Sequence, residues 1–382
     1  MIIKSISKCE AYEVDFIGVG KNEAKQDADA ICFRWKDGNG DYKIAIYDAG
    51  FKPHGEAMVN HLNKYYFNDP DDKLDKSQKY IDYVFASHPH NDHVSGIPII
   101  LDNFSIGCIY MNMPWLYTDE LLKIADSDGR STEKTLEEEL REDYSLINDI
   151  EKQARKQRIE IRPAFAGTKI DGGVLRILSP GRGFYLQKVI ESKKTQRIQP
   201  IKEECSFSEN GKELRDGAYE SWSGETLGDE HVETDAENDT SIVLYGFKDR
   251  GGMLLCGDAG VESLENAEIT ARRECILLKD DVKFVEIPHH GGRHNVSTAL
   301  LDQLFGSPLV ENEEANKTAY VSVAEGSDHP RKVVVNAYIR RGFKVFKTDG
   351  GIRWHHSGDM PRRNDFYKST DNLDFNHWVE EW

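Results

Sequence analysis

Short hydrophobic runs with the alternation of β-strands recur along the whole chain, separated by turn residues or by helical patterns. Near the start, residues 11–20, 30–35 and 42–47 predict three strands, and the Gly- and Asp-rich residues 36–41 predict a hairpin between the second and third. Further strands are predicted at 83–86, 106–111, 159–161, 174–178, 238–245, 252–258, 282–287, 319–323, 344–347 and 352–356, and helices at 55–64, 261–273 and 332–341. The pattern predicts an α/β fold.

Two stretches depart from this alternation. Residues 118–157 place apolar side chains at helical spacing in a strongly charged background, which predicts a helical insertion on the surface. Residues 183–237 are rich in Lys, Glu, Ser and Gly without clear periodicity, which predicts an irregular inserted loop. Residues 360–382 form a polar tail that ends in aromatic side chains. We therefore expect one domain over residues 1–359 with two insertions, followed by the tail.

Metal-capable residues are concentrated directly after the strand predicted at 83–86. His88, His90, Asp92 and His93 fall within six positions, spaced His-x-His-x-Asp-His. Imidazole and carboxylate are ligands that borderline divalent metals prefer, and the end of a strand holds them rigidly. Burying such groups unpaired would cost about 1–3 kcal/mol each, so their crowding favours a bound metal over chance adjacency.

Two later strands also end in metal-capable residues. Residues 252–258 end at Asp258, and residues 282–287 lead into Pro288-His289-His290. Strand ends of this kind, far apart in the sequence, predict a site that is assembled at one edge of the sheets.

The composition narrows the range of functions. The chain has 382 residues and a formal net charge of −18, which argues against a protein that coats anionic polymers through bulk charge. No window approaches the ~18–20 apolar residues of a membrane helix. The six cysteines are scattered without Cys-x-x-Cys pairs, which argues against a zinc ribbon or a disulfide framework. We expect a soluble, cytoplasmic protein that does not act at a membrane.

The His-x-His-x-Asp-His element, Asp48-Ala49-Gly50, Cys256-Gly257-Asp258 and His289-His290-Gly291 together resemble the metallo-β-lactamase superfamily. This resemblance, which spans residues 10–356, implies an αββα sandwich with two metals at its edge. Within the superfamily, the detail resembles the hydrolase domain of the DNA-uptake protein ComEC and its free-standing relatives. The motifs that carry this narrower likeness are residues 238–244, 254–258, 288–291, 322–330 and 347–351.

The resemblance implies two groups of metal ligands that share one bridging carboxylate. The implied ligands are His88 and His90 for the first metal, Asp92, His93 and His289 for the second, and Asp258 as the bridge. His290 is the alternative to His289 and is otherwise expected to orient the loop. Asp48 is interpreted either as a partner that orients the ligand loop or as a turn residue. Mixed His and Asp ligands suit zinc and manganese alike, so the expected cofactors are two divalent ions of either kind.

One departure from the family pattern concerns the first metal. Many members carry a further His in a Pro-Gly-His turn, but the comparable turn here is Pro180-Gly181-Arg182. Either His231, in the second insertion, supplies this ligand, or water completes the site. We favour water, because relatives of the ComEC type also tend to lack that His.

The resemblance implies a metal-dependent hydrolase, and more narrowly a phosphodiesterase or nuclease in which a hydroxide shared by the metals attacks phosphorus. Asp92 and His329 are the candidates for proton transfer, although a His-Pro pair can also cap the next helix. The alternative substrates are a cyclic nucleotide, a phosphocholine ester, a lactone or a thioester, which suit the negative charge better than long polyanions. A third interpretation is a hydrolase controlled by a protein partner through residues 118–157, residues 183–237 or the tail.

Overall fold

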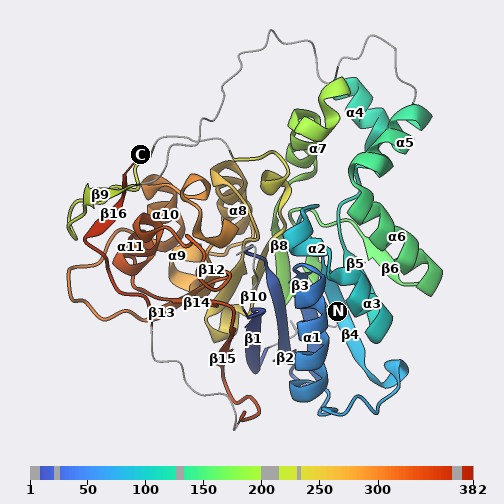
Figure 1. The fold of residues 1–382 in the computed structure, drawn as a ribbon, viewed down its shortest axis with the longest axis horizontal. Helices are drawn as coiled ribbons and strands as arrows, with labels where there is room; N and C mark the ends of the chain where they lie inside the picture. The colour runs from blue at the N-terminus through green and yellow to red at the C-terminus, as the bar shows by residue number, and fades with distance from the viewer. Residues whose placement is uncertain are drawn as a thin grey trace, which may run out of the picture.

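A computed structural model describes residues 9–20, 26–125, 133–198, 215–229, 234–363 and 372–381. Within these ranges the chain forms two seven-stranded sheets packed face to face, with helices on both outer faces (Figure 1). This arrangement confirms the predicted α/β class and the αββα sandwich. A small third sheet pairs β9 (Arg215–Tyr219), from the second insertion, with β16 (Trp378–Glu381), from the tail.

The first sheet contains the predicted opening hairpin. In spatial order its strands are β15 (Ile352–Ser357), β1 (Ala11–Ile17), β2 (Ala30–Lys36), β3 (Tyr42–Ala49), β4 (Tyr80–Phe85), β5 (Ser105–Tyr110) and β6 (Glu160–Arg162). β1, β2 and β3 run antiparallel, whereas β3 to β6 run parallel. Because β2 is antiparallel to β3, Ala30 at the amino end of β2 pairs with Ala49 at the carboxyl end of β3.

The second sheet repeats this combination of parallel and antiparallel pairing. In spatial order its strands are β14 (Phe343–Lys347), β13 (Lys317–Val321), β12 (Val282–Glu286), β11 (Gly252–Leu255), β10 (Val243–Gly246), β8 (Leu175–Ser179) and β7 (Lys169–Ile170). β11 to β14 run parallel. The loops that follow these four strands therefore leave the sheet at the same edge.

Helices cover the outer faces of both sheets. On the first sheet lie α1 (Lys52–Tyr65), α3 (Ile97–Asn103) and α6 (Ser145–Gln157), and on the second lie α8 (Val261–Arg273), α10 (Thr298–Phe305) and α11 (Lys332–Arg340). A further group of helices, α4 (Thr118–Ile124), α5 (Glu133–Asp143) and α7 (Arg182–Glu191), packs together beyond the sheets, at the top of Figure 1. The short helix α2 (Asn91–Val94) follows β4, and the short helix α9 (Leu278–Asp281) precedes β12. Among the described residues, no helix has the length and apolar character needed to cross a membrane.

The strand β1 shows how residue alternation builds the sandwich. Tyr12, Val14 and Phe16 point between the sheets and join the central apolar cluster, where burying each large side chain contributes about 1.5–3 kcal/mol. The alternate residues Glu13 and Asp15 are buried on the opposite face, beneath α1, where they can persist only because basic and hydroxyl groups neutralise or hydrogen-bond them. The central cluster thus holds the two sheets in a fixed relation at their shared edge.

Helices form in both of the stretches that depart from the strand alternation. The described residues of the stretch 118–157 form the helices α4, α5 and α6, and helices are what the apolar spacing predicts. The prediction of an irregular loop over 183–237 is wrong where α7 and β9 form. α7 buries Tyr185, Leu186, Val189 and Ile190, a helical spacing that is too short to stand out in a polar stretch. His231 lies outside the described residues.

Candidate metal centre

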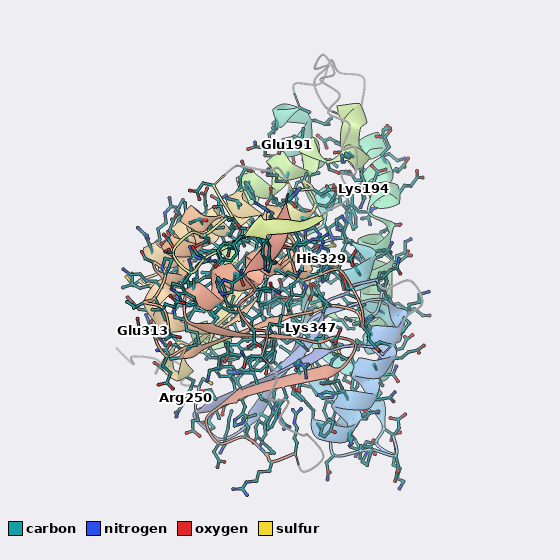
Figure 2. The ribbon with its side chains drawn as sticks, turned by 60° about the vertical axis from the view of Figure 1, so that its left-hand side comes forward. Glu191, Lys194, Arg250, Glu313, His329 and Lys347 are labelled. Carbon is teal, nitrogen blue, oxygen red and sulfur yellow. The ribbon has the colours of Figure 1, made fainter. Side chains whose placement is uncertain are left out.

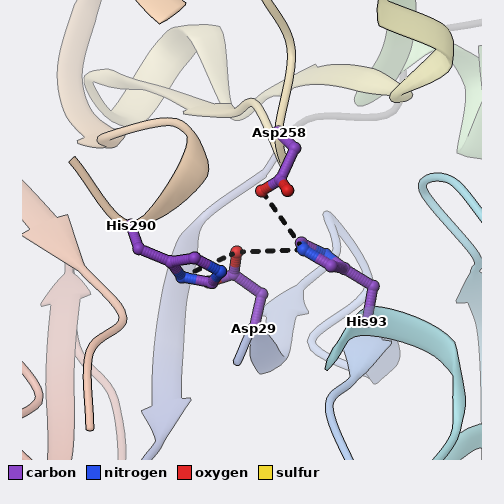
Figure 3. Close-up of side chains that lie close together, drawn as sticks. All are labelled: Asp29, His93, Asp258 and His290. Carbon is purple, nitrogen blue, oxygen red and sulfur yellow. Dashed lines mark ion pairs between the residues drawn. The ribbon is translucent and has the colours of Figure 1, made fainter. Parts of the chain in front are cut away.

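Loops from both sheets converge at one edge of the sandwich. The loop after β4 carries His88, His90, Asp92 and His93, and the loop after β11 carries Asp258. The loop after β12 carries His289 and His290, which belong to a single turn of 3₁₀ helix, His289–Gly291. Figure 3 shows Asp29, His93, Asp258 and His290 pointing toward one another from four different segments.

The ligand loop after β4 is held against the end of β3. Asp48 accepts hydrogen bonds from the Ser87 backbone N–H at 2.8 Å and from the Ser87 hydroxyl. The Gly50 N–H donates to the His93 carbonyl at 3.0 Å, and the Gly96 N–H donates to the Gly50 carbonyl at 2.8 Å. A Cβ on Gly96 would lie 2.1 Å from the Ala49 carbonyl oxygen, so this close approach requires glycine.

His88 and His90 form one group with Asp258. His88 Nε2 lies 3.6 Å from Asp258 Oδ2, and the rings of His88 and His90 have centroids 4.7 Å apart. One ligand atom from each of these three residues lies within 4.8 Å of the others. His289 approaches the same carboxylate oxygen, with its Nε2 3.7 Å from Asp258 Oδ2.

A second group surrounds His93. Its Nε2 lies 3.1 Å from Asp258 Oδ1 and 3.8 Å from an oxygen of both Asp29 and Asp92. His290 closes this group, with Nε2 3.4 Å from Asp92 Oδ2 and Nδ1 3.8 Å from Asp29 Oδ2. The two oxygens of Asp258 therefore face two different sets of imidazoles.

In three of the histidines, Nδ1 makes a hydrogen bond to a neighbouring group, so Nε2 is directed toward the centre. His93 Nδ1 donates to Asp48 Oδ2 at 2.8 Å, and His290 Nδ1 donates to the carbonyl of Ser322 at 2.9 Å. His289 Nδ1 donates to Asn295 Oδ1 at 2.8 Å, and Asn295 in turn donates to the carbonyl of Asp258. Partners of this kind fix the tautomer and orientation of a metal-binding imidazole.

The backbone at His289 and His290 separates the two side chains. Both residues have positive φ, 49° and 55°, a region that non-glycine residues enter at a cost of about 1–3 kcal/mol each. The turn sends His289 toward the group of His88 and His90, and it sends His290 toward Asp92 and His93. The structure thus groups His290, rather than His289, with Asp92 and His93, which differs from the grouping that the family resemblance implied.

The electrostatics of the group are those of a site built for positive charge. Burial raises the pKa of the Asp29 carboxyl above its ordinary value. Burial opposes charge on His93, but the carboxylates of Asp258 and Asp92 outweigh it and hold the pKa of His93 well above its usual range. Burial likewise disfavours charge on His290, but Asp29 and Asp92 raise its pKa to about 10. A cation would take over the role that these protons play.

The donor atoms also fit divalent metals in their spacing. Among the described residues, three buried atoms that meet here have no hydrogen-bond partner, namely His88 Nε2, His93 Nε2 and Asp258 Oδ1. Nitrogen and oxygen atoms bound to one zinc at about 2.0–2.2 Å lie roughly 3.3–3.6 Å apart, close to the separations of 3.1 to 3.8 Å seen here. The residues present therefore fit a pair of divalent ions that share Asp258.

The structure brings six of the predicted site residues together: His88, His90, Asp92, His93, Asp258 and His289. His329 lies apart from this group, hydrogen-bonded to Asp27. Arg182 of the Pro-Gly-Arg turn pairs with Glu120.

The sequence interpretation missed Asp29, because it considered only residues that follow strands. Asp29 precedes β2, and its amide donates to the Asp92 carbonyl at 3.0 Å. The signal that would have found it is the hairpin register, which pairs Ala30 with Ala49 and so places Asp29 beside the ligand loop.

A comparison with protein families matches residues 39–136 to the metallo-beta-lactamase superfamily. The matched segment includes the ligand loop with His88, His90, Asp92 and His93. No curated protein matches the chain. The likeness to ComEC therefore stays a prediction. The similarity of residues 39–136 to this superfamily, the αββα sandwich and the His and Asp clusters at its edge together support a metal-dependent hydrolase.

Proposed function

We propose that this chain is a phosphodiesterase that uses two divalent metals, zinc or manganese, and that its substrate is a nucleic acid or another phosphodiester. The observation that carries the proposal is the position of Asp258. Its Oδ1 faces His93 at 3.1 Å, and its Oδ2 faces His88 at 3.6 Å and His289 at 3.7 Å. A carboxylate shared in this way suits two ions held close together, the arrangement that phosphodiester-cleaving sites use.

The proposed ligand set follows the two groups of side chains, and Asp29 lies beside the second group as a further carboxylate, 3.8 Å from both His93 and His290. We assign His88, His90 and His289 to the first metal, Asp92, His93 and His290 to the second, and Asp258 to both. In this assignment His289 supplies the ligand that the Pro-Gly-Arg turn lacks, so neither His231 nor an additional water is needed as its replacement.

When bound, two divalent metals supply positive charge to both the entering and the leaving oxygen of a phosphodiester. The chain itself determines the direction of approach. His88 and His93 have fully buried side chains and form the floor, whereas Asp92 and His289 keep 27% and 36% of their side-chain surface exposed. The substrate phosphate therefore enters from the side of Asp92 and His289, and Asp92 is placed to receive a proton there.

The net charge of −18 favours short or locally bound phosphodiesters over long duplexes held by bulk attraction. The rival substrates on the same metal pair are lactones and thioesters. The test must therefore compare the two chemistries on the same preparation.

The experiment begins with protein stripped by EDTA and reloaded with zinc or manganese. We expect cleavage of bis-p-nitrophenyl phosphate and of single-stranded DNA or RNA to return with metal, while a lactone and a thioester stay intact. His93→Ala and Asp258→Ala should abolish the recovery, and His356→Ala, an exposed residue of β15, should not affect it. A reloaded wild type that is inert on every phosphodiester but opens the lactone would refute the proposal.

A further inference from the structure

His329, labelled in Figure 2, lies on the loop between β13 and α11. The interpretation of His329 as a helix cap is not supported, because the residue at the cap of α11 is Arg331 and no side chain caps it. The imidazole instead meets a carboxylate from the other sheet, with His329 Nδ1 donating to Asp27 Oδ2 at 2.9 Å.

Asp27 is itself held in place from several directions. Its Oδ1 accepts the Ala324 backbone N–H at 2.7 Å, and its Oδ2 accepts the Ser327 hydroxyl at 2.8 Å. The Ser327 hydroxyl oxygen in turn accepts the backbone N–H of His329 at 3.1 Å. With both oxygens bonded, the carboxylate has a defined position, and it fixes which ring nitrogen of His329 faces outward.

The same loops carry the metal ligands. Asp27 lies two residues before Asp29, whose amide bonds to Asp92 in the ligand loop. After His329, Pro330 packs against Gly291, where an added Cβ would lie 2.4 Å from the proline ring, and the Arg331 N–H donates to the Gly291 carbonyl at 3.1 Å. The Asp27–His329 pair is therefore fixed to both groups of the centre through main-chain contacts.

The free side of His329 is open to a ligand. Its side chain keeps 29% of its surface exposed, whereas that of Asp27 keeps 10%. A partly exposed imidazole that is bound through Nδ1 to a largely buried carboxylate has the geometry of a general acid that is oriented by a partner.

We propose that His329 protonates the leaving oxygen of the phosphodiester and that Asp27 is the residue that positions it; this inference rests on the function proposed above. Water forms the new bond to phosphorus and releases one proton to Asp92, which passes it to solvent. The bond from phosphorus to the leaving oxygen breaks, its electron pair stays on that oxygen, and His329 Nε2 donates a proton to it. His329 then recovers a proton from solvent.

A general acid matters only where the leaving group needs a proton. The test compares the dinucleotide TpT, which releases a sugar alkoxide, with thymidine 5′-(p-nitrophenyl phosphate), which releases a stable phenolate. For His329→Ala we expect kcat on TpT to fall about 10²-fold or more, with KM unchanged and the nitrophenyl ester nearly unaffected. Added imidazole should restore part of the lost TpT cleavage.

Asp27→Asn keeps the shape of the side chain but replaces the acceptor that faces His329 with a donor. We expect about a tenfold loss of kcat on TpT alone, since the imidazole is misoriented rather than removed. Asp328→Asn, the same change at an exposed position of the same loop, serves as the matched control and should behave as wild type. Metal content and thermal melting verify that each variant is loaded and folded.

An active wild type whose variants lose both substrates equally, or lose neither, would overturn this inference and leave the proposed function intact. A wild type that cleaves neither phosphodiester would overturn both. A loss on TpT alone, with imidazole rescue, would support both.

Discussion

Asp48 offers the sharpest test of how the centre is organised, because it contacts a proposed ligand without being one. It is fully buried, and its Oδ2 accepts hydrogen bonds from His93 Nδ1 at 2.8 Å and from the Ser87 hydroxyl. Asp48→Asn keeps the volume but can place an amide N–H against these two donors. His93 must then rotate or move its proton to Nε2, and either change removes the lone pair that faces Asp258.

Loss of such an orienting partner typically weakens metal binding 10- to 100-fold, which corresponds to about 1.4–2.8 kcal/mol. The assay is a competition titration of the EDTA-stripped protein with zinc and a chelating dye at neutral pH. Asp82→Asn is the matched control, since Asp82 is also largely buried and bonds the Ile44 amide at 2.9 Å, but at a distance from the centre. Wild-type zinc affinity in Asp48→Asn, or an equal loss in Asp82→Asn, would refute the reasoning.

Two further predictions concern stability. Arg363 pairs with Asp15 at 2.6 Å and with Glu13 at 2.9 Å in the interior. Arg363→Met should therefore lower the free energy of unfolding, measured by denaturant titration, by about 3–5 kcal/mol. The control is Arg362→Met at an exposed position, and equal stability of the two variants would contradict the argument. His355 stacks on Phe284 with ring centroids 4.4 Å apart, and burial lowers its pKa to about 3. Below about pH 6.5 the unfolded chain therefore binds a proton at His355, whereas the folded chain does not. The contribution of His355 to the free energy of unfolding is complete above that pH and decreases as the pH falls toward 3, by up to about 2 kcal/mol at pH 5. Between pH 7.5 and pH 5, the free energy of unfolding of His355→Phe should fall less than that of wild type. An equal fall in the two proteins would contradict the burial of a neutral imidazole.

The parts of the centre that depend on local spacing could be predicted from the sequence. His88, His90, Asp92 and His93 lie in one loop, and Asp258 follows β11, which runs parallel to β12, so the loops after these two strands leave the sheet at the same edge. These inferences need only the positions of the strands along the chain, and hydrophobic alternation predicts these positions.

The remaining parts depend on how the chain folds back on itself. Asp29 and Asp27 reach the site because β2 runs antiparallel to β3 in one particular register. The grouping of His290, rather than His289, with Asp92 and His93 depends on the positive φ angles of both histidines. The glycines that follow them in the sequence do not reveal these angles. The helix α7 was missed because its apolar positions cover only about two turns in a polar segment. Register, backbone strain and short elements are determined by tertiary packing, so local pattern could not supply them.

The proposed metal ligands come from both sheets, with His88 and His93 after β4 of the first and Asp258 and His290 after β11 and β12 of the second. A cation bound by these residues would therefore link the two sheets of the sandwich at this edge. No nascent chain that ends before His290 contains the complete proposed set, so we expect metal to bind fully only after both halves have been synthesised and have docked. Metal uptake thus reports on completed assembly rather than on the folding of either half.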